Sequence, residues 1–212
     1  MFDIEYKGAN AVIITTKKVR VVFDPNLSLV GMNNVSVKDS IEIATEARFT
    51  IKDSDAKLRI NSPGEYEVGD VSIYGIAARR HIDTESQGKM ATVYKITIGD
   101  TVGVILGNIE ARLSDNQLED IGVVDFVVIP VGGGGYTLNA TEATGVVRQL
   151  NPKVVIPIHY ADAAVNYEVP QDDIAEFIKE LGVNVVETGA RWRFKKMSDL
   201  PDSLAIIHIS RT

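Results

Sequence analysis

The chain has 212 residues, of which 45% are hydrophobic and 24% are charged, and its formal net charge is −7. This composition is typical of a folded soluble protein and predicts one compact domain over residues 1–212. The acidic charge excludes a surface for nucleic acid or for an anionic membrane, and neither a membrane span nor a signal peptide is recognisable, so we expect a cytoplasmic protein.

The first half of the chain consists of short apolar, β-branched runs separated by turn residues, which is the pattern of β-strands. Gly99-Asp100 separates two of these runs, and such a two-residue connection predicts an antiparallel hairpin. The predicted strands are Ala11–Thr15, Val19–Phe23, Ile41–Ala44, Lys57–Ile60, Val71–Ala77, Thr92–Ile98 and Thr101–Leu106.

In the second half, strand-like runs alternate with helical patterns, which is typical of layered α/β proteins. Ser114 and Gln117 fit a capping box at the start of a short helix that ends at Gly122, and Asn139 is placed to cap the next helix. The longer predicted helices are Ala140–Leu150 and a segment from near Pro170 to Leu181. The predicted strands are Phe126–Pro130, Val154–Pro157, Val183–Glu187, Trp192–Phe194 and Leu204–Ile209.

The histidines are the scarcest candidates for chemistry, because the chain has no cysteine and only three histidines. His159 comes just after a predicted buried strand, where open α/β sheets place functional groups, although a structural role explains it too. His81 lies in a polar loop that either covers a cleft or is solvated. His208 shares one face of its strand with apolar residues and carries little functional weight.

Two turns after predicted strands hold further candidates. Asp24 precedes Pro25 at a strand corner, which favours a structural carboxylate over a role in binding substrate or metal. A glycine run and a tyrosine lead into the helix capped by Asn139; these residues are Gly132, Gly133, Gly134, Gly135 and Tyr136. Backbone amides in such a loop can bind an anion at a helix N-terminus, while a tight turn at the rim of a cleft explains the run equally well.

Several segments taken together resemble the metallo-β-lactamase superfamily, and within it the branch of ascorbate-6-phosphate lactonase-like proteins. The resemblance covers Phe2 to Val186. It implies an α/β fold, a four-layer αββα sandwich of two mixed β-sheets flanked by helices, with a binuclear zinc or manganese site at one edge. The segments are Val22–Pro25, Pro63–Gly69, Leu106–Asn108, Ser114–Leu118, Pro130–Thr137 and Pro152–Tyr160.

The resemblance also implies which positions would bind metal, and most of them hold other residues here. The family uses a His-x-His-x-Asp-His loop after a strand, and the matching loop of this chain contains no histidine. Asn108 stands where the family has a metal-bridging aspartate, and only His159 matches a family ligand. The positions that correspond to the loop ligands are occupied by Glu46, Arg48, Thr50 and Ile51.

The leading hypothesis is therefore a non-catalytic or strongly reduced hydrolase homologue that has lost the binuclear zinc site. One histidine cannot supply the roughly three protein ligands that a catalytic zinc ion needs. The guanidinium of Arg48 repels a cation and favours a small anionic ligand, unless it pairs with Glu46 or Asp53. In this hypothesis no cofactor is expected, and the cleft serves ligand binding or assembly.

The alternative is an active metal-dependent hydrolase with a rebuilt mononuclear site. In it, Glu46, Asn108 and His159, with His81 or Asp83, hold one Mn²⁺, Mg²⁺ or Zn²⁺ ion and cleave a small ester, lactone or phosphorylated substrate. A third reading is a structural subunit that forms a homo-oligomer.

Overall fold

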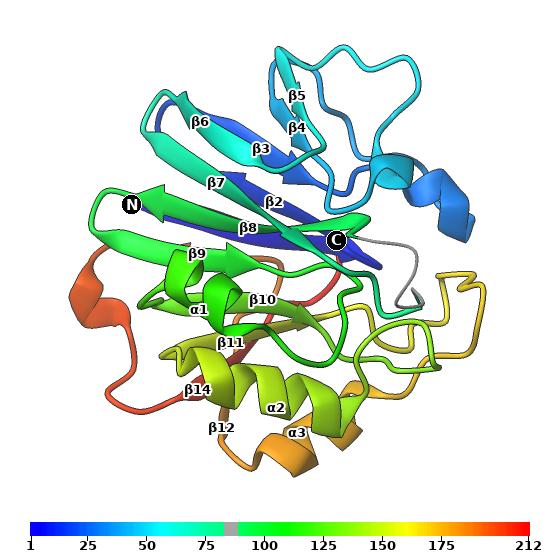
Figure 1. The fold of residues 1–212 in the computed structure, drawn as a ribbon, viewed down its shortest axis with the longest axis vertical. Helices are drawn as coiled ribbons and strands as arrows, with labels where there is room; N and C mark the ends of the chain where they lie inside the picture. The colour runs from blue at the N-terminus through cyan, green and yellow to red at the C-terminus, as the bar shows by residue number, and fades with distance from the viewer. Residues whose placement is uncertain (83–88) are drawn as a thin grey trace.

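The structure, a computed structural model, describes residues 1–82 and 89–212 and contains two β-sheets packed face to face. Both sheets are mixed, and three α-helices accompany the larger one (Figure 1). The predicted α/β sandwich of two mixed sheets flanked by helices is confirmed. No helix in the described part of the chain is long and apolar enough to cross a membrane.

The six-stranded sheet has the order β13-β1-β2-β3-β4-β5. Its strands are β1 (Phe2–Gly8), β2 (Ala11–Thr15), β3 (Arg20–Phe23), β4 (Ile41–Ile43), β5 (Leu58–Ile60) and β13 (Trp192–Phe194). Strand β1 was not predicted, yet Phe2, Ile4 and Tyr6 alternate with charged residues and are buried, as in any strand with one face on a core. The parallel strands β3 and β4 end at the same edge of the sheet.

The eight-stranded sheet has the order β12-β14-β11-β10-β9-β8-β7-β6. Strands β6 to β9 pair antiparallel and contain the predicted hairpin at Gly99-Asp100, whereas β9, β10, β11, β14 and β12 pair parallel. The strands are β6 (Gly64–Val68), β7 (Val71–Ala78), β8 (Ala91–Ile98), β9 (Thr101–Ile105), β10 (Phe126–Pro130), β11 (Val154–Ile158), β12 (Asn184–Glu187) and β14 (Ala205–His208).

The helices α1 (Asp115–Ile121), α2 (Ala140–Leu150) and α3 (Ile174–Leu181) begin at side-chain caps. The predicted capping boxes of Ser114 and Asn139 are both formed. Helix α3 begins later than the predicted start near Pro170, because the Asp173 side chain accepts a hydrogen bond from Ala175 N and caps the helix there. The preceding residue, Asp172, instead donates its backbone N–H to Gly132 O.

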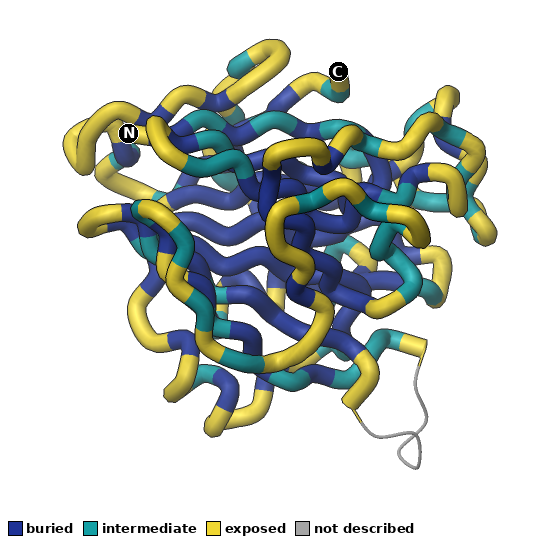
Figure 2. Tube along the Cα trace, turned by 90° about the horizontal axis from the view of Figure 1, so that it is seen from above, coloured by how far each residue is buried: buried dark blue, intermediate teal, exposed yellow. Residues whose placement is uncertain are grey.

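The core lies between the two sheets and under the helices, where one continuous cluster of apolar side chains is buried (Figure 2). Ile13 and Val22 point to the other face of the six-stranded sheet, and loop residues such as Val35 and Val37 cover them. The carboxyl ends of β3, β4, β9 and β11 meet the β1–β2 turn at one edge of the sandwich. The loops that leave these ends carry several buried polar residues, among them Asp24, Glu46, Asn108 and His159.

Candidate functional site

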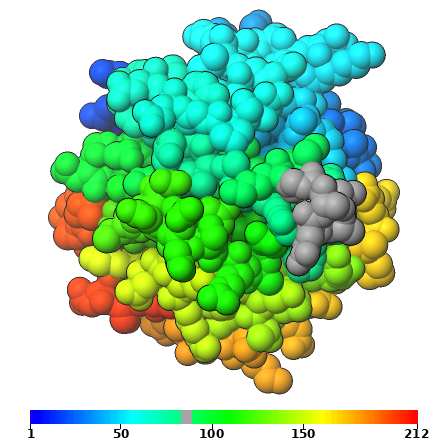
Figure 3. Space-filling view, in the orientation of Figure 1, coloured from blue at the N-terminus to red at the C-terminus, as the bar shows by residue number. Residues whose placement is uncertain are grey.

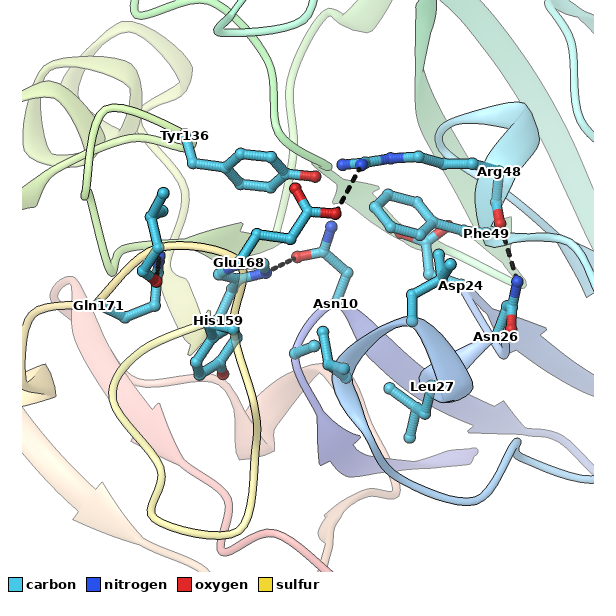
Figure 4. Close-up of a pocket in the computed structure, with 15 residues that line it drawn as sticks. Asn10, Asp24, Asn26, Leu27, Arg48, Phe49, Tyr136, His159, Glu168 and Gln171 are labelled. Atoms are coloured by element: carbon cyan, nitrogen blue, oxygen red, sulfur yellow. Dashed lines mark hydrogen bonds and ion pairs between the residues drawn. The ribbon is translucent and has the colours of Figure 1, made fainter.

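The loops after β3, β4, β10 and β11 enclose a cavity of about 30 Å³ beside the β1–β2 turn (Figure 4). This is room for one or two water molecules, since a water needs about 10–15 Å³. On the surface, the loop around η1 (Leu27–Val30) and the loop between β11 and α3 adjoin at the right-hand edge of Figure 3. The polar lining consists of Asn10, Asp24, Asn26, Arg48, Tyr136, His159, Tyr167, Glu168 and Gln171.

His159 is held rigidly one residue beyond β11. Its backbone is left-handed, with φ of 51°, and its N–H donates to Ala9 O at 3.0 Å. The imidazole is buried and packs on the rings of Tyr136 and Tyr167, with centroids 6.1 Å and 4.8 Å away. Burial, and secondly the charge of Arg48, lower the pKa of His159 to about 3, so the ring is neutral at physiological pH.

A chain of hydrogen bonds connects His159 to Glu46 through two amide side chains. Glu46 Oε1 accepts from Asn108 Nδ2 at 3.3 Å, and Asn108 Oδ1 accepts from Asn10 Nδ2 at 3.3 Å. Asn10 Oδ1 then lies 2.6 Å from His159 Nδ1 (Figure 4). Because an amide oxygen only accepts, Nδ1 carries the proton and Nε2 presents a lone pair. That Nε2 atom is buried and has no partner among the described residues.

Arg48 belongs to η2 (Ala47–Phe49), the short turn that follows β4. Its guanidinium carbon lies 4.8 Å from the centroid of Phe49 and 5.0 Å from that of Tyr136, close enough for cation–π attraction. Nε lies 3.0 Å from Glu46 Oε2, so of the two predicted partners Glu46 is the one found. The alignment is not that of a hydrogen bond: in the described chain, Nε and Nη2 are buried without a hydrogen-bond acceptor.

Asp24 fixes the loop that carries these residues. It ends β3 with φ of 47°, and its carboxylate accepts from Thr45 N at 2.7 Å and from Thr45 Oγ1 at 2.6 Å. Burial raises the pKa of Asp24 to about 7, against the lowering effect of the two hydrogen bonds. These contacts support the structural interpretation of Asp24, although the carboxylate also lines the cavity.

The four residues at the positions of the family's histidine loop are separated by the structure. Glu46 and Arg48 lie at the cavity or directly beneath it. Thr50 turns back to donate to Ala47 O at 2.7 Å, and Ile51 donates its backbone N–H to Glu42 Oε1 at 2.7 Å. The last two residues thus face away from the cavity, and their side chains do not line it.

The glycine run is packed against backbone. A Cβ on Gly132 would lie 2.3 Å from His159 O, and a Cβ on Gly134 would lie 2.5 Å from Pro170 O. This close packing explains the glycines at Gly132 and Gly134 without a ligand. Of the segment 132–136, only Tyr136 lines the cavity.

The remaining candidates lie outside the cavity. His81 donates its backbone N–H to Asn108 O, its Nε2 is 4.0 Å from Glu142 Oε2, and it does not line the cavity. His208 contacts Tyr160 and Glu187 away from the cavity. Asp83 lies outside the described residues.

Sequence reasoning missed Asn10, Tyr167, Glu168 and Gln171, which all line the cavity. Asn10 was within reach, because the alternation of β1 places a turn at Ala9-Asn10 before β2. The other three belong to a loop between β11 and α3 that has no periodic pattern. Nothing in the sequence indicates which of its residues turn inward.

Comparisons with known proteins agree with this fold. Residues 3–159 match the family model described as the beta-lactamase superfamily domain. A search of curated proteins returned no match. A candidate zinc-dependent hydrolase of the metallo-β-lactamase superfamily from Thermotoga maritima is 20% identical, with a TM-score of 0.75 over 99% of each chain.

Two further structures are similar over nearly their whole length. A metallo hydrolase from Ignicoccus hospitalis is 15% identical, with a TM-score of 0.66 over 99% of this chain and 95% of that one. A candidate metal-dependent hydrolase from Parabacteroides distasonis is 16% identical, with a TM-score of 0.64 over 98% and 92%. At these identities the structures show a shared fold. With the family match over residues 3–159, they show that the chain belongs to the metallo-β-lactamase superfamily.

Proposed function

We propose that this chain uses the inherited cleft to bind a small anion at Arg48 and does not carry out binuclear metal hydrolysis. The observation that carries the proposal is the state of the guanidinium: Nη2 of Arg48 is buried without a hydrogen-bond acceptor among the described residues, whereas Nε faces Glu46 Oε2 at 3.0 Å in a poorly aligned ion pair. A buried N–H without an acceptor costs about 1–3 kcal/mol, and more on a charged group. An anion in the cavity that reaches Nη2 would satisfy this donor.

The donor set fits a pair of divalent cations poorly. Within residues 1–82 and 89–212, no three His, Cys, Asp or Glu side chains are grouped so that they could hold a metal ion. Both Asp24 oxygens already accept from Thr45, and Asn108 supplies an uncharged amide. Arg48 adds a positive charge at the same cavity and would repel a cation.

A second candidate function, hydrolysis at a rebuilt mononuclear metal site, has one observation in its favour. The Nε2 lone pair of His159 is buried and unpartnered in the described chain, while Nδ1 is held by the Asn10 oxygen. Metal-binding histidines have this arrangement, with the other ring nitrogen fixed by an oxygen acceptor. The hydrogen-bond network of His159 leads to one carboxylate among the described residues, that of Glu46, and it is engaged by Asn108 and Arg48.

Metal content separates the two candidates. The protein would be purified without chelator, dialysed against Zn²⁺ or Mn²⁺, and its bound metal counted by mass spectrometry. We expect well under one ion per chain with either metal. Stoichiometric metal that is lost in His159→Gln would contradict the proposal and favour the mononuclear hydrolase.

Anion binding is tested directly through Arg48. Millimolar phosphate, sulfate and short carboxylates would be titrated against the wild type and Arg48→Gln, with thermal stability as the readout. At least one anion is expected to stabilise the wild type and to lose that effect in Arg48→Gln. Arg112→Gln is the matched control, because it removes the same charge from an exposed position. An equal response of the wild type and Arg48→Gln to every anion would refute the proposal.

A further inference from the structure

The carboxylate of Glu168 already forms an ion pair with Arg48 in the cavity. Glu168, in the loop between β11 and α3, points into the cavity, and its Oε1 lies 3.6 Å from Arg48 Nη1 (Figure 4). The Glu168 side chain is 56% exposed, so it reaches this place from solvent and is not locked in it. It shows that two methylene groups ending in a carboxylate fit between Arg48 and the loop.

The cavity also presents two acceptors that lack a donor. His159 Nε2 and Gln171 Oε1 are both buried and have no hydrogen-bond partner among the described residues. Gln171 uses its Nε2 on the backbone oxygen of Val169, which leaves Oε1 free. Since His159 is neutral and protonated on Nδ1, its Nε2 can only accept. A ligand that satisfies these atoms must donate a hydrogen bond, as a hydroxyl does.

The other residues that line the cavity determine which class of anion it can bind. Leu27, Val30, Phe49 and Val169 form an apolar lining, and the buried carboxylates of Asp24 and Glu46 lie nearby. A phosphate dianion would lose its hydration against apolar groups and would approach two further carboxylates. A monocarboxylate brings one charge, matches the planar fork of the guanidinium, and can carry a short aliphatic body.

We propose that the cavity binds a short-chain hydroxy monocarboxylic acid. Its carboxylate takes the place that Glu168 holds at Nη1 of Arg48 and extends to the unpartnered Nη2, and its hydroxyl donates to the Nε2 lone pair of His159. The aliphatic body lies against Leu27 and Val30. This inference rests on the proposed anion-binding function and gives the chemistry of the ligand.

In this proposal, the Glu168 carboxylate competes with the ligand for Arg48. The free space of about 30 Å³ holds only one or two water molecules, so the ligand fits only when it displaces the Glu168 side chain and occupies the vacated volume as well. The negative charge of Glu168 also opposes the approach of the anion. An exposed ion pair of this kind contributes about 0.2–1 kcal/mol. Its removal should therefore tighten ligand binding about twofold to fivefold, since a tenfold change corresponds to about 1.4 kcal/mol.

Calorimetric titration at fixed ionic strength tests this with three probes: 3-hydroxybutyrate, butyrate and inorganic phosphate. We expect the wild type to bind 3-hydroxybutyrate about threefold to tenfold more tightly than butyrate, because butyrate leaves the His159 acceptor unpaired. Glu168→Gln should bind 3-hydroxybutyrate about twofold to fivefold more tightly than the wild type does. Glu180→Gln, which removes a carboxylate from an exposed position of α3, should match the wild type.

Four outcomes would overturn the inference. Equal affinity for butyrate and 3-hydroxybutyrate would contradict the proposed hydrogen bond between the hydroxyl and His159. Equal affinity of Glu168→Gln and Glu180→Gln for 3-hydroxybutyrate would contradict the proposed competition of Glu168 for Arg48. Binding of phosphate that depends on Arg48, with no binding of either acid, would reject the ligand class and leave the proposed function standing. If no anion binds the wild type or Glu168→Gln, both proposals fall.

Discussion

Glu46 and His159 are joined through two amide side chains, so that the carboxylate at one end determines the tautomer at the other. An ionised carboxylate only accepts hydrogen bonds, and this turns the Nδ2 of Asn108 toward Glu46. Asn108 Oδ1 must then accept from Asn10, and Asn10 Oδ1 must accept from His159 Nδ1. The lone pair left on Nε2 thus follows from a charge three side chains away.

The tautomer of His159 can be observed by nitrogen NMR on imidazole-labelled protein. We expect the pattern of a neutral ring protonated on Nδ1, unchanged between about pH 5 and 8, where an ordinary histidine titrates. The reason is the lowered pKa of about 3, which burial causes first and Arg48 second. A ring protonated on Nε2, or one that titrates near neutral pH, would contradict the network.

Asp24 predicts a dependence of stability on pH. Burial raises its pKa to about 7 in the folded chain, against about 3.9 in an unfolded one. A raised pKa means that stability is fully present below about pH 4 and is lost as the pH rises through about 7. Between about pH 4 and 7, the free energy of unfolding of the wild type should fall by about 1 kcal/mol per pH unit through Asp24. Urea unfolding at several pH values should show that this part of the decrease is absent in Asp24→Asn.

The comparison with Asp24→Asn is needed because His159 acts in the opposite direction. Its pKa is lowered to about 3, so its contribution is lost as the pH falls below about 6.5. The difference between wild type and variant isolates Asp24. The control is Asp55→Asn, at an exposed position, which should follow the wild type. Parallel pH profiles for wild type and Asp24→Asn would show that Asp24 titrates as in an unfolded chain.

Two glycine substitutions should change stability in opposite directions. Gly132→Ala places a Cβ 2.3 Å from His159 O, and the required backbone shift should cost about 1–3 kcal/mol. Gly145→Ala, inside α2 with nothing within 4 Å of the new Cβ, should stabilise by about 0.5–1 kcal/mol. Denaturant unfolding measures both. A neutral Gly132→Ala would mean that the glycine loop is loosely packed and open to a ligand.

Local sequence predicted much of the fold, because period-two and period-3.6 patterns and side-chain caps are local properties. The capping boxes at Ser114 and Asn139 are examples. Strand β1 was equally readable from the alternation of Phe2 and Ile4 with charged residues. Its place between β2 and β13 was not, because Trp192–Phe194 lies at the other end of the chain.

The candidate site was predictable only where a strand end determines it. His159 follows β11 directly, and Arg48 follows β4 through a short turn. Asn10 meets His159 across 149 residues, a contact that depends on the turn between β1 and β2 and on the packing of the two sheets. Glu168 sits in a loop without periodicity, so its contact with Arg48 could not be predicted from its neighbours.

Asn108 offers a direct test of the proposal that this cleft does not hold a pair of metal ions. Asn108→Asp restores the aspartate that the family resemblance implies at this position. It also places a carboxylate where Nδ2 now donates to Glu46 Oε1 at 3.3 Å, beside a Glu46 whose pKa burial already raises. Two carboxyl groups in contact in a buried site cannot both ionise. The hydrogen bond from Asn10 Nδ2 is kept, because the new carboxylate accepts it as Asn108 Oδ1 does now, so it adds nothing that offsets the repulsion.

We therefore expect Asn108→Asp to lose about 1–3 kcal/mol of unfolding free energy at neutral pH, to regain much of it in acid, and to bind no stoichiometric metal. Asn33→Asp makes the same chemical change at an exposed position and should be neutral. Denaturant unfolding and metal analysis on the same samples give both readouts. If Asn108→Asp instead gained a bound ion and stability with it, Arg48 would not be the group that keeps cations out, since it is unchanged in that variant.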